Sequence, residues 1–431
     1  MGFWKKTVRD IDLSGKSILM RADYNVPVSN GKITDDYRLK QSLPTIRYLL
    51  DKKCKIVITS HMGRPKNKPE DRFSLEPVSK KLSKLLEKDV KFERDCIGKS
   101  VKSASSSLKK GEILLLENVR FHPEEEENDK DFAKAMAKDS SADIFVQDGF
   151  GAVHRAHASI EAITHFLPSV SGLLLEKEVN AITEVIDSPK RPLMAIIGGA
   201  KISGKIDVIK RFIDIADFVA VGGAMANTFL LAKDINIGKS MAEADEVDLA
   251  HEILEKAEAK AKDKPFAFYI PQDGVVAKSM ESNAKTRIVD WDAHVISSIE
   301  SYPKTAPRGS GEVAEDESIL DIGPFSGAFI AGGMQLASTV VWNGAMGVTE
   351  IPSLNGPIGP FSHGTELVVE AILGEFGNKP HSLVGGGDTV GFLAERKIID
   401  KFNHVSTGGG ASLELMSGKV LPGVQALQDK E

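Results

Sequence analysis

Residues 382–389 read Ser382-Leu-Val-Gly-Gly-Gly-Asp-Thr389, a short apolar run that breaks into three glycines. A second run of the same kind follows at His404-Val-Ser-Thr-Gly-Gly-Gly-Ala-Ser412. Glycines directly after a strand free backbone N–H groups to point at one place, and a helix N-terminus behind them favours anions. The pattern predicts strand–loop–helix units whose loops hold phosphate groups.

Short apolar runs alternate with helical segments through the rest of the chain. In the first half the runs are 17–20, 55–59, 113–116 and 143–146, and in the second half they are 193–197, 217–221, 266–270, 319–322, 339–342, 382–384 and 404–406. Segments with helical spacing, such as 75–86 and 243–260, lie between them. Because the runs are continuously apolar rather than alternating, they indicate parallel strands buried on both faces. The fold class is therefore predicted as α/β.

The length of the chain predicts more than one domain. Its 431 residues exceed what one hydrophobic core usually supports, and about eleven strands are too many for one sheet. A helix-like segment at 172–186 is the best candidate for the join. We expect an N-terminal domain over 1–171, an interdomain helix over 172–188 and a C-terminal domain from 189 to 405.

Composition excludes several classes of function. The net charge of −6 argues against a general nucleic-acid binder, which needs a basic surface. No apolar run approaches the ~20 residues of a membrane span, and residues 1–6 lack an apolar signal core, so we expect a cytoplasmic protein. The acidic run Glu124–Glu127 is interpreted as a solvated loop. Two cysteines, Cys54 and Cys96, fit a reducing compartment and are interpreted as buried residues without a catalytic role.

Basic side chains gather at the strand ends of the first half. They are Arg21, His61, Arg64, Arg120, His122, His154 and Arg155. The planar fork of arginine suits phosphate or carboxylate, so several arginines on separate loops predict a polyanionic small molecule as ligand. The His154–His157 spacing resembles a zinc motif, but no third ligand with a fitting spacing accompanies it.

In the second half, lysines and glycines carry the phosphate signal. Gly199 and Gly204-Lys205 have the spacing of a Walker A loop, but Ile206 stands where that motif needs serine or threonine. No GxGxxG fingerprint opens a helix after a strand, which disfavours a dinucleotide-dependent dehydrogenase. Asp388, directly after three glycines, is the best-placed carboxylate for a Mg²⁺ that also touches nucleotide phosphates.

The ordered set of motifs resembles the phosphoglycerate kinase family along essentially the whole chain. It runs from Arg21-Ala-Asp-Tyr-Asn-Val-Pro27, through Ser60-His-Met-Gly-Arg-Pro65, Asn118-Val-Arg-Phe-His122, Ile197-Gly-Gly-Ala-Lys-Ile-Ser-Gly-Lys205 and Trp342-Asn-Gly-Ala-Met-Gly-Val-Thr-Glu350, to Leu421-Pro-Gly-Val-Gln-Ala-Leu427. The resemblance implies two Rossmann-like domains that face each other across a cleft, with a tail over 406–431 that returns to the N-terminal domain. It further implies a monomeric enzyme that transfers a phosphoryl group reversibly from 1,3-bisphosphoglycerate to ADP, giving 3-phosphoglycerate and ATP with Mg²⁺.

The resemblance also implies site residues. The triose-phosphate site would comprise Asp23, Asn25, Arg38, His61, Arg64, Arg120 and Arg155. The nucleotide site would comprise Gly198, Gly199, Lys201, Lys205, Gly222, Gly223, Asn343, Glu350, Gly386, Gly387, Asp388 and Thr389. Asp388 would bind Mg²⁺, and Arg38, Lys201 and Asn343 would serve catalysis. Since the nucleophile is already anionic, no strong general base is needed, and we expect Arg38 and Lys201 to meet over the transferring phosphoryl group.

The chain departs from the family pattern in its nucleotide loops. Ala345 replaces the usual proline, Thr349 the usual phenylalanine and Ala224 the third glycine of its loop. Near the expected hinge the sequence reads Val146-Gln-Asp-Gly149, and the segment 351–363 is longer than usual. These departures leave the arginines and lysines in place, so we predict an active enzyme. The alternative is a non-catalytic protein that binds nucleotides or anions on the same fold.

Overall fold

The computed structural model describes residues 2–430 except 30, 67, 292–293, 298–311, 355 and 357. The chain divides into two compact units. Unit 1 comprises Met1–Ala181, Thr407–Leu415 and Lys419–Glu431, and unit 2 comprises Ile182–Ser406 and Met416–Gly418. The division falls within helix α5, Leu173–Asp187.

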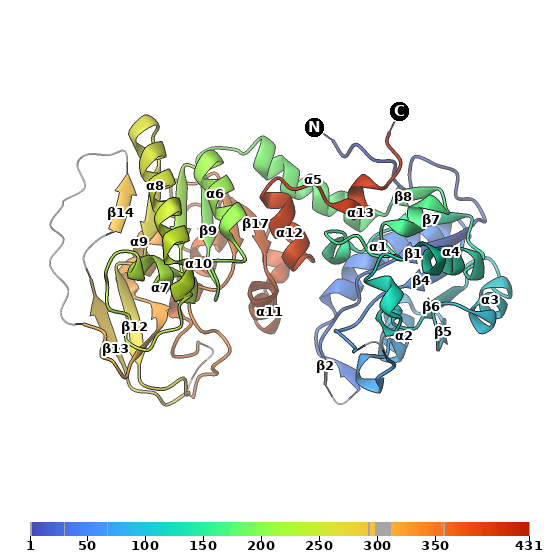
Figure 1. Ribbon diagram of the computed structural model, residues 1–431, viewed down its shortest axis with the longest axis horizontal. Coiled ribbons are helices and arrows are strands. Elements are labelled where there is room, and N and C mark those ends of the chain that lie inside the picture. The colour runs from blue at the N-terminus through green and yellow to red at the C-terminus, as the bar shows by residue number, and fades with distance from the viewer. Residues whose placement is uncertain are drawn as a thin grey trace. The chain divides into compact units, whose positions relative to one another are not determined.

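Unit 1 is built on a six-stranded parallel sheet in the order β5-β6-β4-β1-β7-β8 (Figure 1). These strands are β1 (Ser17–Arg21), β4 (Lys55–Thr59), β5 (Val90–Glu93), β6 (Ile113–Leu116), β7 (Ile144–Gln147) and β8 (Ser169–Ser171). The helices of this unit are α1 (Tyr37–Asp51), α2 (Glu76–Leu86), α3 (Lys99–Ser106), α4 (Lys130–Asp139), α12 (Gly409–Met416) and α13 (Pro422–Gln425), and β2 (Val28–Ser29) pairs with β3 (Lys32–Ile33).

The two faces of this sheet carry separate hydrophobic cores. Alternate strand residues such as Ile18 and Met20 pack with Leu39 and Leu43 of α1. The residue between them, Leu19, packs on the other face with residues of α3 and α4. Because successive strand residues point to opposite faces, an apolar run without polar interruption serves both cores.

The C-terminal residues of unit 1 contact its N-terminal segment and α5. The ammonium group of Lys5 lies 2.7 Å from a carboxylate oxygen of Asp429, and it donates to backbone carbonyls of Gln425 and Leu427. The backbone N–H and hydroxyl of Thr407 both donate to the buried carboxylate of Glu178 in α5. These contacts hold the end of the chain within unit 1.

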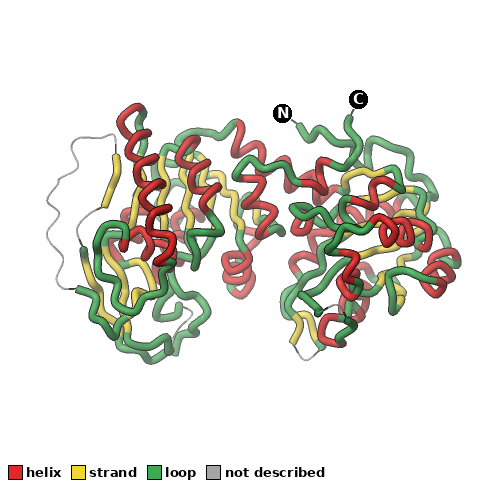
Figure 2. Tube along the Cα trace, viewed as in Figure 1, coloured by secondary structure: helices red, strands yellow, loops and turns green. Residues whose placement is uncertain are grey.

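Unit 2 contains a seven-stranded sheet in the order β14-β11-β10-β9-β16-β17-β18. Its strands are β9 (Leu193–Ile197), β10 (Phe218–Val221), β11 (Ala267–Ile270), β14 (His294–Ser297), β16 (Thr339–Asn343), β17 (His381–Gly385) and β18 (His404–Val405), parallel except for β14. Its helices are α6 (Ile206–Ile215), α7 (Ala224–Leu231), α8 (Val247–Asp263), α9 (Pro324–Met334), α10 (His363–Leu373) and α11 (Gly387–Glu395). Figure 2 shows the strands in yellow between red helices in each unit.

The predicted α/β class with helix-covered parallel sheets is confirmed, but one apolar run was assigned wrongly. The run 319–322 forms part of β15 (Ser318–Ile322), which pairs antiparallel with β12 (Asp273–Ala277). With β13 (Thr286–Asp290) these strands form a separate three-stranded sheet. A short apolar run shows burial but not strand direction, so this antiparallel sheet gave no distinct signal.

Among the described residues, no helix is both long enough and apolar enough to cross a bilayer.

Candidate functional site

The polar residues predicted for the first half lie at the carboxyl edge of the unit 1 sheet. Asp23 and Asn25 follow β1, His61 and Arg64 follow β4, Arg120 follows β6, Arg155 follows β7, and Arg38 lies in the first turn of α1. The four strands are consecutive in the order β6-β4-β1-β7. Since the carboxyl ends of parallel strands share one edge, the sheet brings loops that are far apart in sequence to one place.

Arg38 is held by the loop after β1. Its Nη1 donates to Asp23 at 2.9 Å and to the backbone carbonyl of Asn25 at 3.0 Å. The Asn25 amide oxygen in turn accepts from the backbone N–H of Gly63 at 2.9 Å, which joins this loop to the one after β4. The guanidinium is therefore positioned while a quarter of the side chain stays exposed, at 26%.

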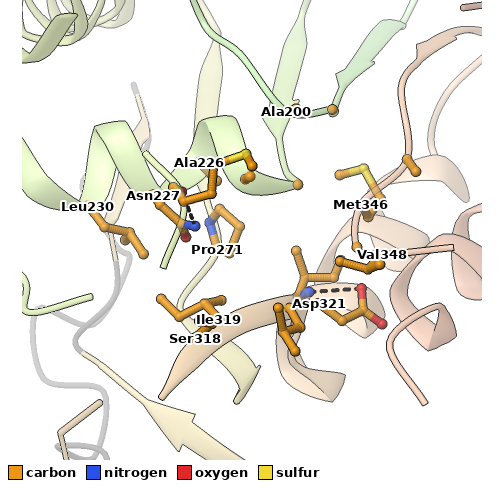
Figure 3. Close-up of a pocket in the computed structure, with 18 of the residues that line it drawn as sticks. Ala200, Ala226, Asn227, Leu230, Pro271, Ser318, Ile319, Asp321, Met346 and Val348 are labelled. Carbon is orange, nitrogen blue, oxygen red and sulfur yellow. Dashed lines mark hydrogen bonds between the residues drawn. The ribbon is translucent and has the colours of Figure 1, made fainter. Parts of the chain in front are cut away.

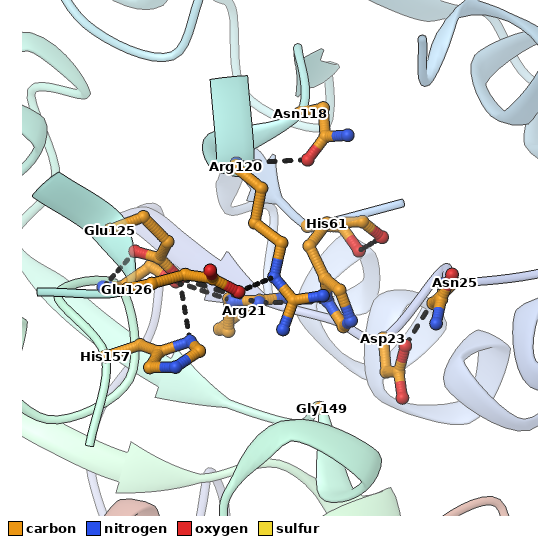
Figure 4. Close-up of polar contacts among 12 residues, drawn as sticks. Arg21, Asp23, Asn25, His61, Asn118, Arg120, Glu125, Glu126, Gly149 and His157 are labelled. Atoms are coloured by element: carbon orange, nitrogen blue, oxygen red, sulfur yellow. Dashed lines mark hydrogen bonds and ion pairs between the residues drawn. The ribbon is translucent and has the colours of Figure 1, made fainter. Parts of the chain in front are cut away.

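Arg120 lies on the same loop network. Its Nη1 donates to the carbonyl oxygen of Gly63 at 2.9 Å, and its Nε lies 3.1 Å from the carboxylate of Glu126 (Figure 4). The φ of Gly63 is +62°, and a Cβ there would lie 2.3 Å from the ring of Phe73. Only glycine fits this turn, and its backbone connects Asn25 with Arg120.

Two histidines beside the arginines are held neutral. Burial lowers the pKa of His61 well below its usual value, and the charges of Arg21 and Arg120 lower it further. Arg21 Nη2 lies 3.2 Å from Nδ1 of His61. Arginine can only donate, so Nδ1 accepts and the proton sits on Nε2, which leaves His61 as a donor. Burial and the charges of Arg120, Arg21 and Arg155 likewise lower the pKa of His157 to about 3.

Sequence reasoning named Arg21 among the basic residues, but it did not foresee that Arg21 and Glu125 are buried and support this cluster. Arg21 is 1% exposed and donates to Ser159 Oγ at 2.8 Å. Glu125 is fully buried, accepts from the backbone N–H and the hydroxyl of Ser159, and lies 3.9 Å from both Arg21 and His157. The interpretation of Glu124–Glu127 as a solvated loop is therefore wrong at Glu125. The sequence of four consecutive acidic residues does not indicate which of them the turn directs into the protein interior.

Within this unit, the remaining predicted residues are more open. Arg64 and Asn25 are exposed, and Arg155 is half-buried with its Nε donating to Nε2 of His154 at 3.2 Å. The unit 1 cluster as a whole combines arginines with neutral imidazole donors at one sheet edge. Such a set can bind an anionic ligand with several oxygens.

In unit 2, three glycine-containing loops meet at the carboxyl ends of β10, β9 and β16. The backbone N–H of Gly199 donates to the carbonyl of Ala345 at 2.9 Å, and that of Gly223 donates to the carbonyl of Met346 at 3.0 Å. A Cβ on Gly198 would lie 2.2 Å from the Ala345 oxygen, and one on Gly223 would lie 2.6 Å from backbone atoms of Gly199. The glycines are required because three backbones approach this closely.

The side chain of Lys205 contacts the backbone of these loops, and the loop that carries it is not a P-loop. Its Nζ donates to the carbonyl oxygens of Gly198 and Asn343. Burial lowers the pKa of Lys205 to about 8, and the charge of Asp388 partly opposes this shift. Lys201 belongs to the same loop and is exposed.

Asn343, at the end of β16, is the most informative polar residue in this unit. It is 3% exposed, and neither its amide nitrogen nor its amide oxygen has a hydrogen-bond partner in the structure. A buried amide without partners costs free energy unless a ligand or water completes it. Gly386, with a φ of +99°, and Thr389 lie beside it, and Thr389 Oγ1 accepts from the backbone N–H of Gly344.

A cavity of about 580 Å³ opens beside these loops. Gly199, Gly223, Glu350 and Asp388 line it among the predicted residues, whereas Gly222 is buried behind Met346. Figure 3 shows Ala226 and Leu230 of α7 on one side and Ser318 and Ile319 of β15 on the other. Its lining is mainly apolar, which suits a flat aromatic ring system. The three-stranded sheet supplies one wall, and sequence analysis did not foresee this contribution.

Two aspartates, Asp273 and Asp321, line this cavity. Asp273 accepts from the backbone N–H groups of Phe325 and Ser326 at the start of α9. Burial raises the pKa of Asp321 to about 8, against the opposing effect of backbone donors from Gly364 and Ile322. Asp321 is therefore largely protonated at neutral pH, which allows it to sit beside Asp273.

Of the departures noted in the sequence, Ala345 and Ala224 lie in the described loops and leave their backbone contacts intact. In the longer segment 351–363, residues 355 and 357 lie outside the described residues.

Comparisons with known proteins agree on one family. Residues 8–419 match the sequence pattern of the family described as phosphoglycerate kinase. The chain is similar to the phosphoglycerate kinases of Pelotomaculum thermopropionicum, at 42% identity, and Dictyoglomus turgidum, at 44%, with 99% of this chain and 100% of each relative covered. It is also similar to the solved phosphoglycerate kinases of Coxiella burnetii (36% identity, TM-score 0.78) and Pyrococcus horikoshii (30%, 0.81), with 98% of both chains covered in each case.

Proposed function

Because the chain belongs to the phosphoglycerate kinase family, we propose that its two clusters divide the two substrates between them. The protein is a phosphotransferase with a carboxyl group as acceptor, and it interconverts 1,3-bisphosphoglycerate and ADP with 3-phosphoglycerate and ATP. The comparisons offer no support for a non-catalytic protein on this fold.

The unit 1 cluster binds the triose phosphate in this proposal. The ligand carries a phosphate at one end and a carboxylate or acyl phosphate at the other, so it needs cations at both ends. Arg38 and Arg120 are oriented through the Asn25–Gly63 connection, and neutral His61 supplies a donor from its Nε2. The exposed Arg64 and the half-buried Arg155 complete the predicted set.

The unit 2 cavity binds the nucleotide. Its apolar lining accepts the base, and the N-terminal turn of α11, which contributes Asp388 to the lining, presents backbone N–H groups to the phosphates. The observation that carries this assignment is Asn343, a buried amide with both polar atoms unpaired beside Lys205 and the Gly386 turn. A buried amide left unpaired beside these loops is explained by a ligand that completes its hydrogen bonds.

Mg²⁺ fits the residue at the start of α11. Asp388 is exposed in the first turn of this helix and lines the cavity, so its carboxylate oxygens are accessible. Carboxylates and nucleotide phosphates are the usual protein-side and substrate-side ligands of this ion. When bound, Mg²⁺ would neutralise charge on the phosphate oxygens.

Residues of the chain align the two substrates and stabilise the charge on the phosphoryl group during its transfer. The attacking group is a carboxylate or a phosphate oxygen, so neither direction requires deprotonation of a hydroxyl. We assign the catalytic roles to Arg38, Lys201 and Asn343, which stabilise the charge that spreads over the moving phosphoryl group. The cytoplasmic location and monomeric state stay predictions.

A coupled assay tests the reaction, and calorimetry tests the assignment of the clusters. We expect turnover of ATP with 3-phosphoglycerate, followed as NADH oxidation with added glyceraldehyde-3-phosphate dehydrogenase, that disappears without Mg²⁺. Asp388→Asn should weaken the binding of MgATP and leave the binding of metal-free ATP nearly unchanged. Glu395→Gln on the same helix is the control, and it should change neither affinity. Equal weakening with and without Mg²⁺ would remove Asp388 as the metal ligand. Turnover with GTP in the same assay would rank the nucleotides.

A further inference from the structure

A cluster of mixed ligand types lies outside both proposed substrate sites. Asp95, Cys96 and His122 each offer one ligand atom, and the three atoms lie within 4.8 Å of one another. Asp95 and Cys96 follow β5, and His122 follows the short helical turn Val119–Phe121 after β6. Because β5 and β6 are neighbouring parallel strands, the sheet brings these residues together at its carboxyl edge.

The contacts within the cluster hold its two accessible members in place. His122 Nε2 lies 2.9 Å from Asp95 Oδ1, and the same carboxylate accepts from the backbone N–H of Cys96 at 2.7 Å. The imidazole packs against the ring of Phe132, with centroids 5.2 Å apart. The backbone N–H of Glu117 donates to the carbonyl oxygen of Asp95 at 3.3 Å and so connects the two loops.

The members of the cluster differ in exposure: the carboxylate and the imidazole reach solvent, and the thiol is buried. The side chains of Asp95 and His122 are 45% and 28% exposed, whereas Cys96 is 1% exposed and belongs to the core around α3 and α4. A cation can therefore approach from solvent to the carboxylate and the imidazole and meet the thiol beneath them. Packing alone does not require a carboxylate, an imidazole and a thiol to converge.

We propose that Asp95, Cys96 and His122 form a binding site for a borderline-soft divalent cation such as Zn²⁺, with water as the fourth ligand. Bond lengths of about 2.0 Å to N and O and 2.3 Å to S place tetrahedral ligand atoms roughly 3.3–3.6 Å apart. The three ligand atoms lie within 4.8 Å of one another, so any pair at that limit would have to approach by about 1 Å, while Asp95 Oδ1 and His122 Nε2, at 2.9 Å, would have to separate slightly. Thiolate and imidazole ligands exclude Mg²⁺, which prefers oxygen, so this site is chemically separate from the one at Asp388.

Metal binding at this site releases a proton. Burial raises the pKa of the Cys96 thiol well above its usual value, and the carboxylates of Asp95, Glu125 and Glu117 raise it further. The thiol must lose its proton to form the metal–sulfur bond, and that proton leaves to solvent. The bound cation would tie the β5–α3 loop to the segment that carries Arg120, two residues before His122.

Cobalt titration of the full, untagged chain tests the site without measuring activity. Co²⁺ in place of Zn²⁺ should give the near-ultraviolet charge-transfer absorption of a thiolate–cobalt bond, and added Zn²⁺ should abolish it. Cys96→Ala should remove this absorption. Cys54→Ala is the matched control, since Cys54 is the other buried thiol and donates to the carbonyl of Leu13.

His122→Gln keeps the test decisive if the Cys96 variant folds poorly, because His122 is partly exposed. It should weaken Co²⁺ binding at least tenfold and leave the fold unchanged by circular dichroism. Absence of the thiolate band in the unmodified protein would overturn the proposal. Retention of the band in the His122 and Cys96 variants, or its loss in Cys54→Ala, would do the same.

Discussion

In unit 1 the proposed site is built from charged side chains, whereas in unit 2 close contacts between main chains set the shape of the proposed site. Arg38, Arg120 and His61 are positioned by a second set of residues, among them Arg21, Glu125 and Asp23. In unit 2, Gly198, Gly199 and Gly223 let three backbones lie in contact, with no side chain between them. In the proposed assignment, one fold class holds anions by two means, and we expect mutations to affect these two means differently. Substitution of an arginine in unit 1 removes a charge from the site, whereas substitution of a glycine in unit 2 changes the shape of the loops.

The largest expected effect comes from removing a charge in unit 1. Arg38→Ala should lower kcat by about 10³-fold, the scale of an arginine that stabilises a transferring phosphoryl group. Nucleotide affinity, measured by calorimetry, should be nearly unchanged because Arg38 belongs to unit 1. Arg47→Ala is the control, since Arg47 lies on the same helix and is exposed. Comparable turnover in Arg38→Ala and Arg47→Ala would refute a catalytic role for Arg38.

A change of shape should dominate in unit 2. In Gly223→Ala the new Cβ meets Gly199 backbone atoms at 2.6 Å, and the φ of +66° disfavours alanine. We expect nucleotide affinity to fall about tenfold or more and the free energy of unfolding to fall by about 1–3 kcal/mol. Gly204→Ala should change neither, because no atom lies within 4 Å of its Cβ position and its φ is ordinary. Equal behaviour of the two variants in calorimetry and thermal denaturation would contradict the backbone account of this site.

The support beneath the unit 1 cluster should matter for stability more than for chemistry. Glu125→Gln removes the buried negative charge beside Arg21 and weakens the bonds to Ser159, so we expect a loss of about 2 kcal/mol in the free energy of unfolding. Urea denaturation measures this loss. Glu127→Gln, a change at an exposed acid of the same run, should stay within about 0.5 kcal/mol. A neutral result at position 125 would show that Arg21 does not depend on this carboxylate.

The smallest expected effect on ligand binding is a pH dependence at Lys205. Its pKa of about 8 in the folded chain lies below the ordinary value of 10.5. Between these values the native lysine is neutral while the unfolded chain still binds a proton, so Lys205 makes the free energy of unfolding rise from pH 8 to 10.5. The folded protein loses the charge of Lys205 as the pH rises through about 8, and this loss should weaken nucleotide binding.

Comparison of the wild-type protein with Lys205→Arg isolates this contribution, because arginine keeps its charge throughout that range. Nucleotide affinity of the variant should change less between pH 7.5 and 9.5 than that of the wild type, by calorimetry with correction for buffer protonation. Parallel pH profiles would show that Lys205 does not contact the phosphates.

The sequence by itself determined the fold class, the family and the chemistry of the ligands. Continuous apolar runs imply strands covered on both faces, glycines after strands imply exposed backbone donors, and arginines after strands imply anions, and each inference needs only local order along the chain. The site residues predicted from family resemblance stay predictions, although the structure places those of each unit at strand ends and helix starts.

Only the tertiary structure decided the direction of β15, the burial of Glu125, the unpaired amide of Asn343 and the meeting of Asp95 with His122. Each depends on segments distant in sequence. Ser159 satisfies Glu125, β12 pairs with β15, and the neighbouring strands β5 and β6 bring Asp95 to His122. The local sequence determines which chemical groups a residue carries. Its burial and its hydrogen-bond partners depend on packing between distant segments, and no short stretch of sequence contains that information.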